Sequence, residues 1–148
     1  MSLSITRATV DDVDTLAPLF DLYRVFYGQP SDPVLARDFI RARLARGESV
    51  ILLASAEGEA VGFTQLYPAF SSVGAARTWI LNDLLVAPAA RRTGVARALL
   101  AAAAAFARDD GALRLELETD HDNATAQALY RAMGWETYDG TLRFRLAL

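Results

Sequence analysis

The sequence of 148 residues contains no cysteine and a single histidine, His121. Without cysteine the chain forms no disulfide bond and cannot hold an acyl group on a thiol. The histidine and the carboxylates show no metal-ligand spacing, and the hydrolase pattern G-x-S-x-G is absent. Neither the P-loop nor the dinucleotide fingerprint is present. These absences argue against a metal centre, a serine hydrolase, a nucleotide kinase and a dinucleotide enzyme.

Long runs of one kind are missing as well. No apolar stretch approaches the roughly 18 uncharged residues of a membrane helix, because Arg97 and Arg108 bracket the alanine run at 101–105. No signal-peptide pattern precedes the first polar residues. The basic residues are dispersed and the net charge is -3, which disfavours nucleic acid as the main partner. We therefore expect a cytoplasmic globular protein without a membrane anchor.

Hydrophobic residues make up 53% of the chain, enough for a substantial core. A chain of this length can bury roughly two-thirds of its unfolded surface in one domain. Because we find no internal repeat, linker or low-complexity segment, we expect a single domain over residues 1–148.

Hydrophobic periodicity and turn residues predict an alternating order of strands and helices. The expected strands are 3–7, 49–56, 60–70, 77–86, 113–119, about 135–138 and 142–147. The expected helices begin near Val13, at Pro33, at about Gly94 and after Asp122 or Asn123. This order predicts an α/β (α+β) fold with a mixed, mostly antiparallel sheet of 6–7 strands and about four flanking helices. The strand–helix–strand unit after residue 77 should cross over right-handed.

The stretch from Leu84 to Leu100 has the features of an anion site. An apolar run breaks at Pro88, passes Arg91 and Arg92, and enters a helix at about Gly94. The first turn of a helix has backbone N–H groups without intrahelical partners and carries a positive partial charge. Glycine lets the backbone approach a ligand closely, and arginine pairs bidentately with phosphate oxygens. The alternative is a solvated basic loop before a surface helix.

A second motif lies downstream, over Asn123–Trp135. Together with residues 91–96, it resembles the GCN5-related N-acetyltransferase (GNAT) superfamily. The signature Q/R-x-x-G-x-G/A matches at 91–96, and N-x-x-A-x-x-L-Y-x-x-x-G-F/W matches at Asn123, Ala126, Leu129, Tyr130, Gly134 and Trp135. The resemblance implies acetyl-CoA as the cofactor. It also implies the GNAT fold, splayed between the fourth and fifth strands, 77–86 and 113–119, where pantetheine inserts.

The resemblance assigns cofactor contacts to residues of both motifs and of the preceding strand. They are Leu85, Val86, Arg91, Arg92, Thr93, Gly94, Val95, Ala96, Asn123, Ala126 and Tyr130. Leu85 and Val86 would pair with pantetheine as an added strand does. Tyr130 would be the general acid for the leaving thiolate, or else an ordinary core aromatic. Asn123 would contact the cofactor, cap the last helix, or do both.

Transfer to an amine also needs a base, because an ammonium is charged at neutral pH. Asp83, which interrupts an apolar strand, and Glu118, near the end of the next strand, are the candidates. The alternative for each carboxylate is an ordinary, solvated strand residue with no part in catalysis. Water stays open as the base, and His121 is a weaker candidate.

An acceptor pocket in this fold would be built by the first two helices and the strands beneath them. The residues expected there are Tyr23, Phe26, Tyr27, Gln29, Gln65, Tyr67, Trp79 and Asn82. Core aromatics plus a surface loop are the alternative. The segments that carry these residues resemble a GNAT subgroup that includes acetylases of small amines and amino acids.

We therefore expect an acetyl-CoA-dependent N-acetyltransferase that acts on a primary amine of a small molecule by direct attack in a ternary complex. One alternative is a protein or peptide N-acetyltransferase of the same fold, with an open acceptor groove. Another is a non-catalytic acetyl-CoA-binding regulatory module. Edge strands expected at the C-terminal end make a homodimer reasonable.

Overall fold

The computed structural model describes residues 2–148, and its elements follow the expected order up to the last helix. The strands are β1 (Leu3–Arg7), β2 (Val50–Ala56), β3 (Glu59–Ser71), β4 (Ala76–Val86) and β5 (Leu115–Glu116). The α-helices are α1 (Val13–Phe26), α2 (Pro33–Ala45), α3 (Val95–Asp109) and α4 (Ala124–Ala132). Two short 3₁₀ helices, η1 (Val10–Asp12) and η2 (Pro88–Ala90), precede α1 and α3.

The strands form one sheet in the order β1-β2-β3-β4-β5. Neighbours are antiparallel from β1 to β4, and β5 runs parallel to β4. The mixed, mostly antiparallel sheet is thus confirmed, but the expected 6–7 strands are five in the described residues. The strand expected over 113–119 is reduced to Leu115–Glu116.

The two strands expected at about 135–138 and 142–147 are wrong, because neither segment is a strand in the structure. Their period-2 pattern is real, but Leu142, Phe144 and Leu146 are 84%, 92% and 83% exposed. A strand needs a neighbouring strand for its backbone hydrogen bonds and a surface for its apolar face. The alternating pattern alone supplies neither.

The chain divides into two compact units, Met1–Glu118 and Thr119–Leu148. The first contains the sheet and α1 to α3, and the second contains α4 and the C-terminal segment. The single domain over residues 1–148 stays a prediction. Among residues 2–148, no helix has the length and apolar character needed to cross a membrane.

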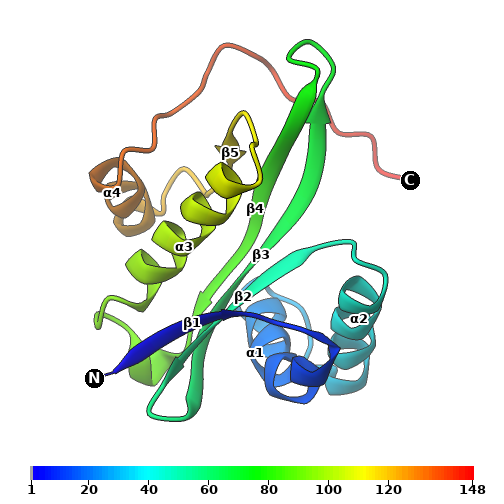
Figure 1. Ribbon diagram of the computed structural model, residues 1–148, viewed down its shortest axis with the longest axis vertical. Helices are drawn as coiled ribbons and strands as arrows, with labels where there is room; N and C mark the ends of the chain where they lie inside the picture. Colours follow the sequence, from blue (N-terminus) through cyan, green and yellow to red (C-terminus); the bar gives the residue numbers. More distant parts are fainter. Residues whose placement is uncertain (1) are drawn as a thin grey trace. The chain divides into compact units, whose positions relative to one another are not determined.

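Helices cover both faces of the sheet in the first unit (Figure 1). On one face, Leu16 and Phe20 of α1 and Ile40 of α2 pack with Phe63 and Leu85 of the sheet in a buried cluster. On the other face α3 packs closely on β3. A methyl group built on Gly62 would lie 3.2 Å from Val95 Cγ1 and 2.6 Å from the Leu85 carbonyl oxygen. Glycine at position 62 therefore allows the close contact between helix and sheet.

The fourth and fifth strands separate as expected. Only Trp79 and Ile80 of β4 pair with β5, opposite Leu115 and Glu116. Residues 81–86 continue β4 with β3 on one side and no strand of residues 2–148 on the other. The outer edge of the second half of β4 is therefore open.

Candidate active site

The loop after β4 presents an uncapped helix start. Pro88–Ala90 form a 3₁₀ turn, and Gly94, the N-cap of α3, has φ 87° and gives no side-chain cap. The first-turn N–H groups of α3 are thus left for water or a ligand. A Cβ at Gly94 would meet no atom within 4 Å, so the site is open at this point. The helix start predicted at about Gly94 is confirmed.

Two arginines on this loop are exposed to solvent. Arg91 donates from Nε to the Val86 carbonyl, 3.4 Å away, so its side chain lies back along the end of β4. Arg92 has φ 63°, a left-handed conformation that is unfavourable for a side chain with a Cβ. The Thr93 hydroxyl donates to the Ala90 carbonyl and closes the turn. Positive charge and free backbone donors thus meet at one place, as an anion site requires.

Asp83, in the middle of β4, is a buried carboxylate, and only 2% of the residue is exposed. Its two oxygens accept hydrogen bonds from Gln65 Nε2 and Asn82 Nδ2, each at 2.7 Å. No arginine of residues 2–148 forms an ion pair with it. Burial raises the pKa of Asp83 above its usual value, and the two hydrogen bonds lower the pKa in part. Such a carboxylate is suited to accept a proton or to hold a cation.

A β-bulge explains why this carboxylate points inward. Gln65 pairs with Asp83 and Leu66 pairs with Leu81, so Asn82 is an extra residue in β4. A bulge changes which face the following side chains reach. After it, Asp83 and Leu85 lie on the face covered by α1 and α2, where Leu85 belongs to the buried cluster.

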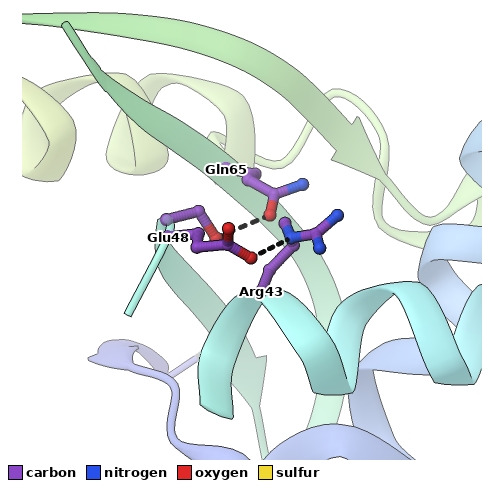
Figure 2. A network of polar contacts seen from close by, with 4 residues as sticks. Arg43, Glu48 and Gln65 are labelled. Atoms are coloured by element: carbon purple, nitrogen blue, oxygen red, sulfur yellow. Dashed lines mark hydrogen bonds and ion pairs between the residues drawn. The ribbon is translucent and has the colours of Figure 1, made fainter. Parts of the chain in front are cut away.

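Polar contacts continue from Asp83 to the protein surface. The Ser49 hydroxyl donates to Gln65 Oε1 at 2.8 Å and fixes the orientation of the amide. Glu48, the neighbour of Ser49 in the chain, accepts from Arg43 Nε at 3.0 Å. Figure 2 shows Gln65 beside this ion pair, near the end of α2. The buried carboxylate is thus held by a connected polar network through Gln65 and Ser49, and the Arg43–Glu48 ion pair lies beside it.

Several of the residues expected at the acceptor site gather around this network. The Tyr23 hydroxyl donates to the Asn82 carbonyl at 3.1 Å, and the Tyr23 and Tyr27 rings lie 4.9 Å apart. Burial raises the pKa of Tyr67 to about 12, and the Asp83 charge contributes to the rise. The Phe26 ring contacts Tyr27 at 5.2 Å but is 63% exposed. Gln29 is exposed in the loop after α1.

Trp79 does not join this group, which corrects the sequence prediction. Its indole donates to Asp110 at 2.9 Å and its ring packs on Phe106 at 5.1 Å, so it faces α3. Simple alternation along β4 would put Trp79 and Asp83 on one face. The bulge at Asn82 shifts that alternation and separates the two side chains.

The second unit carries the other motif on α4. Asn123 Oδ1 accepts from the Ala126 N–H at 3.3 Å, so the expected cap is formed by Asn123. Tyr130 is half-buried, and its ring lies 6.1 Å from that of Trp135. Gly134 follows the helix with φ 91°, as its place in the motif predicts.

The remaining base candidates lie outside regular structure. Glu118 is exposed and follows the end of β5 by two residues, because β5 is shorter than expected. His121 is exposed in the turn before α4.

Sequence reasoning missed three residues of the network, Ser49, Thr64 and Arg43. Thr64 is fully buried, and its hydroxyl donates to the Asp83 carbonyl at 2.7 Å. The signal for Thr64 was a polar residue inside an apolar strand, the same signal that singled out Asp83, whereas Ser49 directly precedes the apolar strand β2. Arg43 carried no such signal, because arginine is ordinary on a surface helix.

Comparison with known proteins defines the class. The chain is 47% identical over 144 residues to the uncharacterized N-acetyltransferase YhfO of Bacillus subtilis (strain 168), covering 97% of each chain. It is 33% identical over 109 residues to an aminoglycoside N(6')-acetyltransferase type 1 of Stenotrophomonas maltophilia, covering 71% of each. A crystal structure of a probable acetyltransferase superposes with TM-score 0.93 at 44% identity, covering 98% of this chain and 97% of the other. Fold and relatives thus define an acetyltransferase.

Residues 16–135 match the model of the acetyltransferase (GNAT) family, and the chain belongs to that family. It is an acyltransferase, and members of the family use acetyl-CoA as the acetyl donor. The residues present fit this donor. The uncapped start of α3, the open space at Gly94 and the exposed Arg91 and Arg92 suit its phosphates, and the open edge of β4 suits a strand-like chain with amide groups.

Proposed function

We propose that this protein is an acetyl-CoA-dependent N-acetyltransferase that acts on a primary amine of a small molecule, by direct attack in a ternary complex. The observation that carries the proposal is the buried Asp83 carboxylate, which has a raised pKa and no ion-pair partner in the described residues. A side chain that only filled the core would need no charge here, whereas a side chain that binds an ammonium group of the acceptor needs a negative charge. The absence of cysteine agrees with direct transfer.

On the donor side, we assign phosphate binding to residues 91–96. Arg91 and Arg92 supply charge, and the N–H groups after Thr93 and Gly94, at Val95 and Ala96, supply donors. The backbone of Leu85 and Val86 lies on the open part of β4 and would hold the pantetheine arm by β-augmentation. When bound, acetyl-CoA supplies an activated acetyl group and a thiolate leaving group.

On the acceptor side, Asp83 holds the ammonium and takes its proton before attack. Gln65 and Asn82 orient the carboxylate through their amide hydrogens. Tyr23, Tyr27 and Tyr67 provide aromatic surface for a cation, with Phe26 and Gln29 at the exposed rim. Glu118 and water are the competing bases that the experiments must separate from Asp83.

On the second unit, we propose Tyr130 as the acid that protonates the leaving thiolate. A phenol with a pKa near 10 can donate to a thiolate whose conjugate acid has a pKa near 8.5. Asn123 caps α4 and, with Ala126, is proposed to line the donor site. A purely structural Tyr130 would leave turnover intact when its hydroxyl is removed.

The test is an acceptor screen that detects release of free coenzyme A thiol. The chain contains no cysteine, so a thiol-reactive chromogenic reagent detects only the product. Small amines, amino acids, aminoglycosides and peptides form the panel. Turnover on small amines supports the proposal, turnover on peptides alone favours a peptide N-acetyltransferase, and donor binding without any turnover favours a regulatory module.

We also propose a cytoplasmic homodimer. The cytoplasm is proposed because a charged coenzyme A thioester does not cross membranes unaided. The dimer is proposed because β5 leaves one sheet edge open in the described part of the chain, and Leu142, Phe144 and Leu146 are exposed. Light scattering should give twice the monomer mass, and Phe144→Glu should lower it while Val73→Glu, at another exposed apolar residue, should not. A monomeric mass for the unaltered protein would exclude the dimer.

A further inference from the structure

A cavity lies on the face of the sheet that α3 covers, and Ser49 is the one residue of the Asp83 network in its lining. Its volume is about 240 Å³, and its lining includes Arg7, Arg77, Trp79, Phe106 and Asp110. These residues come from the end of β1, the start of β4 and the C-terminal end of α3. The volume is many times the roughly 30 Å³ that a water molecule occupies in the liquid. The cavity therefore has room for a small molecule.

This cavity is distinct from the proposed donor site. Phe106 lies eleven residues after Val95 along α3, and a helix rises 1.5 Å per residue, so the two positions are about 16 Å apart. Trp79, which faces this cavity, is on the opposite face of the sheet from Asp83 because of the bulge. A ligand bound here would contact neither proposed reaction partner.

Two guanidinium groups face this cavity without an anionic partner. Arg7 lies over the Phe106 ring at 5.4 Å, and Arg77 lies over the Trp79 and Phe70 rings at 5.1 Å and 4.7 Å. Neither arginine is in any ion pair of residues 2–148. The aromatic faces hold both guanidinium groups in place and leave their edges for a ligand.

The Nε atom of Arg77 adds an independent observation. It is buried and has no hydrogen-bond acceptor in the described chain. A buried donor without an acceptor is unfavourable and points to an acceptor supplied from outside the chain. The nearby Asp110 is occupied by the Trp79 indole. Arg77 thus has hydrogen-bonding capacity that the described chain does not use.

We propose that this cavity binds a small oxyanion, a phosphate or carboxylate group, between the guanidinium groups of Arg7 and Arg77. With Asp110 counted, the ionisable groups of the lining carry one net positive charge. Arginine forks match the geometry of both oxyanions. The ligand would also contact Trp79, which pairs with β5, so binding would stabilise the β4–β5 junction.

Tryptophan fluorescence gives a direct test. The chain has two tryptophans, Trp79 and Trp135, so Trp135→Phe leaves Trp79 as the only reporter. This variant is titrated with phosphate and, separately, with a small dicarboxylate, while chloride at matched ionic strength corrects for screening. We expect a saturable change in Trp79 emission with at least one oxyanion. The oxyanion whose titration saturates at the lower concentration, phosphate or the dicarboxylate, identifies the class of ligand that the cavity prefers.

Substitutions then locate the response. Arg77→Gln should abolish it or raise Kd at least about tenfold, the loss expected for a charge-assisted pair. Arg77→Lys, which keeps the charge but not the fork, should weaken it less. Arg108→Gln, an exposed arginine of α3 outside the lining, should leave it unchanged, as should Arg92→Glu in the donor loop.

Two results of the fluorescence titrations would overturn the site. One is a Trp79 signal that follows chloride and both oxyanions alike. The other is an equal loss in Arg77→Gln and Arg108→Gln. Thermal unfolding gives a second measurement in case Arg77→Gln is unstable: a saturable rise in Tm with the oxyanion in the parent variant, absent in Arg7→Gln, supports the site, and no rise in the parent rejects it.

Discussion

Replacing Asp83 by asparagine is expected to remove most of the acetyl transfer and to preserve the fold. Asparagine has the same shape and can still accept one of the two hydrogen bonds that Gln65 and Asn82 donate, but its amide takes no proton. General-base catalysis typically contributes about 10²- to 10⁴-fold to the rate, which corresponds to about 3–5 kcal/mol. We expect kcat/KM to fall by a factor in this range.

The assay is thiol release at saturating acetyl-CoA with the acceptor varied. Circular dichroism and calorimetric titration with acetyl-CoA verify that the variant is folded and binds the donor. Asp109→Asn is the matched control, because Asp109 is an exposed carboxylate at the end of α3. A surface change of this kind should alter kcat/KM by less than about twofold.

A folded Asp83→Asn variant that binds acetyl-CoA and turns over at the unaltered rate would refute the assignment. Glu118→Gln in the same assay then decides the next candidate. Loss of turnover there would make Glu118 the base, and retention in both variants would leave proton removal to water.

Four further changes test other parts of the site and fold. Gln65→Leu should move the acidic limb of the pH profile of kcat/KM to higher pH, because the hydrogen bond from Gln65 lowers the pKa of the buried Asp83 carboxylate. An unmoved limb would mean that the group that titrates in the profile is not Asp83. Arg92→Glu should weaken acetyl-CoA binding about tenfold at low salt by calorimetry, and Arg108→Glu should not; equal affinities would count against phosphate binding by the loop. Tyr130→Phe should lower kcat without changing donor affinity, and unchanged kcat would leave the tyrosine a structural role. Gly62→Ala should lower the free energy of unfolding by about 2 kcal/mol in urea, since its Cβ would lie 2.6 Å from a backbone oxygen; equal midpoints would mean that the strands adjust freely.

The helices and the four long strands could be predicted because their signals are local. Asp32 and Pro33 mark the start of α2, and Asp32 Oδ1 accepts from the Leu35 N–H at 3.1 Å. The donor loop was predictable for the same reason, because its proline, glycine and arginines act locally in the chain. Periodicity likewise identified β2 to β4, most of whose apolar residues are buried, with Phe70 and Ile80 as exposed exceptions.

The bulge and the C-terminal segment could not be predicted, because they depend on neighbouring strands. Nothing in the sequence around Asn82 states that β3 skips that residue in pairing. The pattern of Leu142 and Phe144 predicted a strand, but strand formation depends on another edge. Trp79 was predicted on the wrong face of the sheet for the same reason, because the face that its side chain occupies depends on where the bulge shifts the alternation of β4.

The bulge links the stability of the sheet to the chemistry proposed for it. Because the pKa of Asp83 is raised on folding, this group contributes stability that is fully present below its unfolded pKa of about 3.8 and is lost as pH rises through the folded pKa. Above the folded pKa the ionised carboxylate therefore opposes folding, and the hydrogen bonds from Gln65 and Asn82 offset part of that cost. A raised pKa also brings a base closer to the pH at which it must work. The same burial that destabilises the sheet thus makes Asp83 a better proton acceptor. The hydrogen bonds from Gln65 and Asn82 limit both the loss of stability and the rise in pKa.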